Sequence, residues 1–358
     1  MTISKKSKAL FALPVSVFLC ATVQASHHFE AASFLTDTRL AQVDNFIFPS
    51  DKKGNTTIIM TVNYDPKFGA NQTFHPYAIY NIHLASNEDL NNGTAYSIQF
   101  NNDNYTVFEL DSSNALPGTI GKKIGSGKLD QVGQLGNGVR GFAGIIKDPF
   151  FGNSNSLIKY REENDKGEAY NPNIWKEADG KSIFLGRTVG AIVLDIPNKR
   201  LGNEIRAFFT TDLKENGKWK QVQYSAIPLL SHSMLMNSDT QKKIHDSSRP
   251  SEEYNKDLKK IISATILRAT TLANKTNTNL VQYADQTAET LVPDVIPYKV
   301  GTPAIFSLNK INGRALGDDI MTVMLTKLFG EHTDQAIKNP KAYESKFPFV
   351  IPVKSLKK

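Results

Sequence analysis

Alternating hydrophobic and polar positions dominate the first two thirds of the chain. Residues 56–64 are dense in β-branched side chains and stop at an Asp-Pro pair, which is typical of a strand end. Residues 77–84, 95–100 and 105–110 alternate in the same way, and joints rich in Asn and Asp separate them. Strands at this spacing predict an antiparallel sandwich or barrel-like body.

The middle of the chain continues this β pattern with two interruptions. Residues 117–138 are rich in glycine, but no helix pattern follows them, so we expect hairpins or loops instead of a phosphate-binding loop. Residues 152–181 are polar and predict an inserted loop. Residues 188–196 are apolar on both faces and predict a central strand, with residues 205–211 pairing beside it as the next strand.

The pattern changes to a helical period after residue 231. Residues 257–273 place apolar side chains on one face and lysines opposite, and shorter helices are predicted near residues 282–291 and 318–329. Gly330 stands where the last of these would end. We therefore predict an α+β fold, predominantly antiparallel β with a sandwich-like body and C-terminal helices packed on it.

The first 25 residues have the pattern of a secretory signal peptide. Three lysines precede an apolar stretch from Ala9 to Val23, and Ala25 fits the small-residue cleavage rule. Cleavage there would remove Cys20, the chain's one cysteine, and lower the formal net charge from +7 to +4 because three lysines are lost. The remaining lysines are scattered, which argues against a nucleic-acid partner.

We accordingly expect an exported protein, periplasmic or extracellular, that is not an integral membrane protein after cleavage. Its mature part, residues 26–358, is expected to be a single module. Within it we expect a β-rich part at residues 26–230, an α-rich part at 231–340 and an extended tail at 341–358.

One cluster of potential metal ligands follows the leader directly. It contains His27, His28, Glu30 and Asp44, with Asp37 between them. Imidazole and carboxylate groups suit zinc, copper or iron, so a divalent metal is one hypothesis for a cofactor. Adjacent histidines on a regular strand point to opposite faces, so at most one of His27 and His28 would bind there.

A structural interpretation competes with the metal site. Glu30 and Asp44 would pin the N-terminal segment to the sheet through hydrogen bonds or by pairing with Arg39 or Arg314. This interpretation requires no cofactor, and we prefer it to the metal site.

Two consecutive carboxylates, Asp318 and Asp319, form a second candidate beside Arg314. Near the start of a helix such carboxylates cap free amides and complement the helix dipole. We prefer capping to a catalytic role, although this pair could share one site with the N-terminal cluster. Trp175 and Trp219 lie in polar stretches where exposed aromatic rings could bind sugars, but two rings are too few for a prediction.

Seven separated segments resemble a bacterial exported family. They are residues 26–31, 44–48, 140–144, 148–151, 191–197, 291–295 and 312–319, and they follow one another in the family's order. On these segments the chain resembles domain-of-unknown-function family 4331, which implies export, one β-rich module and no established activity. The chain departs from the family at His28-Phe29, where one arginine is usual, and at residues 81–89, which lack most of the family's acidic side chains.

The sequence thus favours a non-catalytic binding or interaction module over an enzyme. The alternative is a metal-binding protein or metal-dependent enzyme that uses His27, His28, Glu30 and Asp44, with Asp318, Asp319 and Arg314 as a co-site. No His-Glu-x-x-His or Gly-x-Ser-x-Gly motif occurs in the chain.

Overall fold

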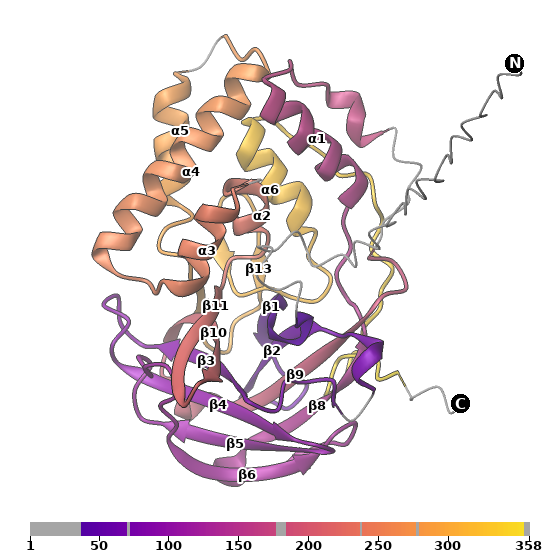
Figure 1. The fold of residues 1–358 in the computed structure, drawn as a ribbon, viewed down its shortest axis with the longest axis vertical. Helices are drawn as coiled ribbons and strands as arrows, with labels where there is room; N and C mark the ends of the chain where they lie inside the picture. Colours follow the sequence, from indigo (N-terminus) through magenta and orange to yellow (C-terminus); the bar gives the residue numbers. More distant parts are fainter. Residues whose placement is uncertain (1–36, 70–71, 177–183, 237, 277–278, 354–358) are drawn as a thin grey trace, which may run out of the picture.

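The computed structural model describes residues 37–69, 72–176, 184–236, 238–276 and 279–353. Within these residues the chain forms an α+β fold, as the sequence predicted. Antiparallel strands build a sandwich-like body, and the helices gather on one side of it (Figure 1). No helix of the described ranges is long and apolar enough to cross a membrane.

Two large sheets make up the body, and all their strand pairs are antiparallel. The five-stranded sheet has the order β1 (Gln42–Pro49), β2 (Asn55–Asn63), β9 (Thr188–Pro197), β8 (Arg140–Lys147) and β7 (Gly133–Gln134). The seven-stranded sheet has the order β11 (Lys218–Ser225), β10 (Glu204–Glu215), β3 (Ala78–Ala85), β4 (Gly93–Asn101), β5 (Asn104–Leu110) and β6 (Lys122–Lys128), with β12 (Ile296–Lys299) also pairing with β10.

The main hydrophobic core lies between these two sheets. Ile58 and Ile192 from the five-stranded sheet share one cluster with Ile82, Ile98 and Phe209 from the seven-stranded sheet. Each such side chain contributes about 1.5–3 kcal/mol when it leaves water. The alternation seen in the sequence therefore places one face of the long strands in a shared interior.

Strand β9 is central, as its apolar pattern predicted. It lies between β2 and β8. Ile192 and Leu194 face the main core, while Ala191 and Val193 face a second cluster that also contains Phe349 from the C-terminal segment. Both faces of the strand are covered, which explains why its sequence shows no polar face.

The predicted pairing of residues 205–211 with residues 188–196 is wrong. Strand β10 belongs to the other sheet, where Phe209 lies opposite Ile82 of β3. The neighbours of β9 are already β2 and β8, so no ladder edge remains for β10. The short connection between β9 and β10, with Gly202 at φ 76°, carries the chain from one sheet to the other.

Six helices of the described residues form the second layer. They are α1 (Ser154–Lys166), α2 (Leu230–Met234), α3 (Asp239–Ser247), α4 (Glu252–Leu272), α5 (Leu280–Glu289) and α6 (Ile320–Phe329). The three helices that the sequence predicted correspond to α4, α5 and α6, and Gly330 ends α6 in the left-handed conformation. Ile262, Ala284 and Met324 join these three helices in one apolar cluster.

Helix α1 corrects the expectation of a loop over residues 152–181. The side chain of Asn153 caps its first turn, and Gly167 ends it at φ 73°. Its buried face includes polar side chains such as Arg161 and Asn164, so the hydrophobic period is weak. The β-rich and α-rich parts therefore interleave in sequence, because α1 precedes β9 and β12 follows α5.

Candidate functional site

Three of the four predicted metal ligands, His27, His28 and Glu30, lie outside the described residues. The fourth, Asp44, is in β1 and is only 4% exposed. Among the described residues, no group of three His, Cys, Asp or Glu side chains is placed to hold a metal ion. The N-terminal metal site therefore stays a prediction.

Asp44 forms a buried ion pair with Arg314, which is one of the pairings that the sequence suggested. The Nη1 group of Arg314 donates to a carboxylate oxygen of Asp44 and to the main-chain oxygen of Asn45, the latter at 3.2 Å. The guanidinium carbon also lies 4.1 Å from the centre of the Phe46 ring. Burial raises the pKa of Asp44, and the Arg314 charge only partly opposes this.

The main chain reinforces this pair. The N–H of Arg314 donates to the oxygen of Ile47 at 2.9 Å, and the N–H of Ile47 donates back at 3.0 Å. Side-chain charge and main-chain bonds thus attach the segment before α6 to β1. The pair has a structural task in this arrangement, and a carboxylate held by an arginine is a poorer metal ligand.

Asp318 and Asp319 cap and brace the start of α6. Asp319 accepts hydrogen bonds from the N–H and the hydroxyl of Thr322, at 3.1 and 2.9 Å, as an N-cap residue does. Asp318 accepts from the N–H of Ala315 at 2.7 Å. Burial raises the pKa of Asp318, and the hydrogen bond from Ala315 and the Arg314 charge oppose this rise only in part. The capping interpretation is confirmed for Asp319.

A second buried acid lies near the Asp44–Arg314 pair. Asp148 is 3% exposed, and its Oδ2 lies 3.8 Å from Nε of Arg187. Burial raises the pKa of Asp148 to about 7, the Arg187 charge opposes the rise, and the nearby Asp44 charge adds to it. Its Oδ1 accepts from the N–H of Phe150 at 3.0 Å. These acids and arginines form a buried charge network.

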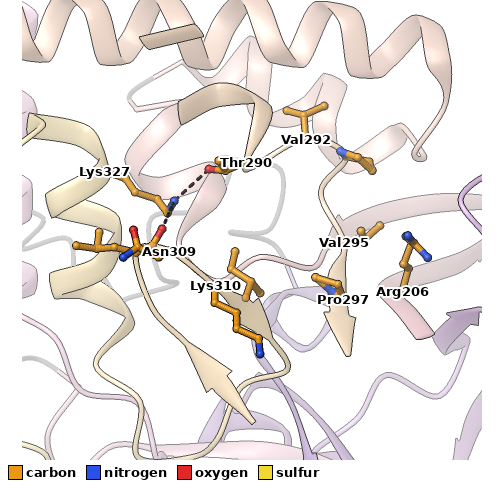
Figure 2. Close-up of a pocket in the computed structure, with 11 residues that line it drawn as sticks. Arg206, Thr290, Val292, Val295, Pro297, Asn309, Lys310 and Lys327 are labelled. Carbon is orange, nitrogen blue, oxygen red and sulfur yellow. Dashed lines mark hydrogen bonds between the residues drawn. The ribbon is translucent and has the colours of Figure 1, made fainter. Parts of the chain in front are cut away.

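A different part of the fold offers a cavity. It lies where the end of α5, strand β12, the turn between β13 (Ile305–Phe306) and β14 (Ile311–Asn312), and helix α6 meet strand β10 (Figure 2). Its volume is about 310 Å³. We call it the cationic pocket, and it is lined by Arg206, Thr290, Val292, Pro293, Val295, Pro297, Leu308, Asn309, Lys310, Ile311 and Lys327.

The charged residues of the cationic pocket are all positive. They are Arg206, Lys310 and Lys327, and no acidic residue lines the cavity. Arg206 pairs at 3.1 Å with Glu88, whose side chain is 87% exposed, so that pair is weak in water. Figure 2 shows Lys327 on one side of the cavity and Arg206 on the other, with Val295 and Pro297 close to the arginine.

Lys327 is the most constrained of these cations. It is 5% exposed, and its Nζ donates to the hydroxyl of Thr290 at 3.0 Å and to the main-chain oxygen of Leu308 at 3.1 Å. An ammonium group has three N–H donors, so one remains for another acceptor. No carboxylate of the described residues forms an ion pair with it, and burial lowers its pKa.

Apolar side chains complete the cavity wall. Val292, Val295, Leu308 and Ile311 supply hydrocarbon surface, and prolines lie between them in the chain. Most small-molecule sites combine an apolar lining with a few placed polar groups in a volume of roughly 300–1,000 Å³. The cationic pocket has this composition at the small end of that range.

The sequence contained one signal for this site. Lys327 is seven residues after Ile320 and three after Met324, so it falls on the apolar face of the helix predicted near residues 318–329. A lysine on such a face must either reach solvent or find a polar partner. The other lining residues come from separate elements, and only the fold brings them together.

In comparisons with known proteins, no family model, curated protein or solved structure matches the chain.

Proposed function

We propose that this chain is an exported binding protein that holds a small organic anion with an apolar body in the cationic pocket. Export is supported by the leader of residues 1–25, in which lysines precede an apolar stretch. Binding is supported by the pocket itself, and the observation that carries the proposal is Lys327, a buried cation to which the described residues bring no carboxylate partner.

The argument from Lys327 is energetic. Burying a charged group is costly unless an opposite charge or several hydrogen bonds offset the lost hydration. Two hydrogen bonds offset part of this cost for Lys327. A carboxylate on a ligand would supply the missing charge and use the third N–H, which makes a charge-assisted hydrogen bond.

The rest of the pocket defines the remainder of the ligand. Lys310 is exposed and Arg206 is half-buried, so both add positive potential without the constraint seen at Lys327. The apolar lining favours a hydrocarbon body over a second charged group. A cavity of about 310 Å³ suits one or two fused rings or a short chain.

The binding experiment uses two ligands of equal shape and different charge. Calorimetric titration with 2-naphthoate and with its neutral analogue 2-naphthamide separates the charge from the apolar body. We expect 2-naphthoate to bind more tightly by roughly ten- to hundredfold, because a hydrogen bond to a charged group contributes about 1.5–3 kcal/mol. In Lys327→Met this preference should disappear.

The control is Lys299→Met. Lys299 is on β12 and exposed, and it does not line the cationic pocket. Its removal changes the net charge equally and should leave the preference unchanged. Equal affinity of the wild type for both ligands, or a preference that survives Lys327→Met, would contradict the proposal.

A further inference from the structure

A second cavity lies on the seven-stranded sheet, away from the cationic pocket. It has a volume of about 360 Å³. We call this cavity the outer-face groove. It is lined by Pro76, Tyr77, Gln99, Phe100, Asn101, Thr106, Phe108, Lys214 and Trp219. No residue is shared with the cationic pocket.

Strand register places most of this groove on the sheet face that points away from the main core. Ile98 and Val107 lie opposite each other and face the core, so the adjacent pair Gln99 and Thr106 faces outward. Lys214 and Trp219 also lie opposite each other, and Leu213, the neighbour of Lys214, faces the core. The groove therefore lies on one outer face, where its lining comes from β5, β4, β10 and β11 and from Tyr77 directly before β3, the strand between β4 and β10.

Two aromatic side chains, Tyr77 and Trp219, line the groove on either side of Lys214 in the sheet. Tyr77 precedes β3 and is 69% exposed, while Trp219 on β11 is half-buried. The backbone at Gly118 packs against the indole, since a Cβ there would lie 2.2 Å from Cγ and 2.3 Å from Cδ1 of Trp219. This contact holds the ring in place before any ligand binds, which reduces the entropy lost on binding.

Polar side chains in the same groove have unused hydrogen-bonding capacity. Gln99 and Asn101 form no side-chain hydrogen bond within the described part of the chain. The ammonium of Lys214 forms none there either, and it lies 5.8 Å from the centre of the Trp219 ring. The hydroxyl of Thr106 forms a hydrogen bond with the hydroxyl of Ser126 at 3.0 Å. Amides offer donors and acceptors together, and the groove has no acidic residue.

We propose that the outer-face groove binds a neutral, β-linked oligosaccharide. Sugar rings present C–H faces that stack on aromatic rings and hydroxyls that both donate and accept, so aromatic rings flanked by amides match both surfaces. From Trp219 to Gln99 the groove crosses three strand spacings, about 14 Å. A groove of that length fits an extended β-linked chain better than a coiled α-linked one.

The test is calorimetric titration of the full chain with cellohexaose, a β-linked glucan, and with maltohexaose, its α-linked counterpart. We expect cellohexaose to bind with a Kd of about 1 mM or tighter and maltohexaose to bind at least about tenfold more weakly. Trp219→Ala and Gln99→Ala should each weaken cellohexaose binding, Trp219→Ala by about tenfold or more. Val132→Ala, an exposed apolar residue outside the groove, serves as the matched control.

Tryptophan emission supplies an internal check on folding. Trp175 is 3% exposed within the helical cluster, so its emission reports the fold in Trp219→Ala. In the wild type, cellohexaose should shift the emission of Trp219, and in the variant the emission should stay constant. No heat with cellohexaose, or binding that survives both groove substitutions, would overturn the proposal and point to another occupant such as a protein chain.

Discussion

Arg314→Leu should destabilise the protein more than any substitution of an exposed charge. Arg314 is 1% exposed, and its guanidinium bonds Asp44, which is 4% exposed. Leucine fills part of the same volume but leaves the Asp44 carboxylate buried without its counter-charge. Breaking a buried ion pair in this way costs about 3–5 kcal/mol.

A surface pair sets the scale for comparison. Lys259 and Glu289 also form an ion pair, but their side chains are 39% and 60% exposed. Lys259→Met should cost only about 0–1 kcal/mol, because water screens the pair and hydrates the remaining carboxylate. Each variant removes one positive charge from an ion pair. The difference between their losses of unfolding free energy therefore measures the effect of burying the pair.

Urea denaturation followed by far-UV circular dichroism gives both free energies of unfolding. The loss of unfolding free energy in Arg314→Leu should become smaller as pH falls. In the variant, the folded-state pKa of Asp44 lies above its unfolded value, so protonation at low pH favours the folded state. A loss below about 1 kcal/mol at neutral pH with an unchanged urea slope would refute the assignment of Arg314 as the counter-charge of Asp44.

Two further substitutions test the fold around this network. Burial raises the pKa of Asp148 in the folded protein to about 7, whereas in the unfolded chain it is near 4. Its contribution to stability is therefore complete below about pH 4 and is lost as pH rises toward 7, by at most about 1.4 kcal/mol per pH unit. Asp148→Asn should therefore remove part of the decline in stability between pH 4 and 7, measured by urea denaturation at each pH; an unchanged pH profile would contradict this. Asp319→Ala removes the N-cap of α6 and should cost about 1 kcal/mol, whereas Asp319→Asn should cost less because its amide oxygen still accepts from Thr322. Equal losses in both cap variants would show that the charge, and not the capping bond, stabilises the helix.

Local pattern was enough to predict much of the fold. The alternation in residues 77–84 and 95–100 reflects strands that bury one face, and the two apolar faces of β9 reflect cores on both sides. Asp319 and Gly330 mark the ends of α6 through chemistry that acts within a few residues. Such signals depend on the neighbouring sequence and hence are visible without a structure.

Features that depend on distant partners were not predictable. Strand β10 changes sheet because β9 already has two neighbours, which local alternation does not reveal. Helix α1 buries Arg161, whose Nη2 donates at 2.5 Å to the main-chain oxygen of Met236, so its pattern looks polar. Arg314 was correctly named as a partner for Asp44, but Arg39 fitted the sequence equally well.

The candidate site also combines one feature visible in the local sequence with others that depend on distant residues. Lys327 carried a local signal, since it interrupts an apolar helix face. Its significance depends on Thr290 and Leu308, which accept its hydrogen bonds from other elements. Arg206 lines the pocket from the seven-stranded sheet, more than 80 residues before Thr290, the next lining residue along the chain.

The most direct test of the proposed function is a crystal structure of the full chain soaked with 6-bromo-2-naphthoate. Anomalous scattering from bromine locates the ring system independently of any assumption about the site. We predict that the ring lies against Val295 and Ile311 and that a carboxylate oxygen lies about 2.7–2.9 Å from Nζ of Lys327. Bromine bound elsewhere, or a carboxylate that points away from Lys327 into solvent, would contradict the proposal that this pocket holds an organic anion.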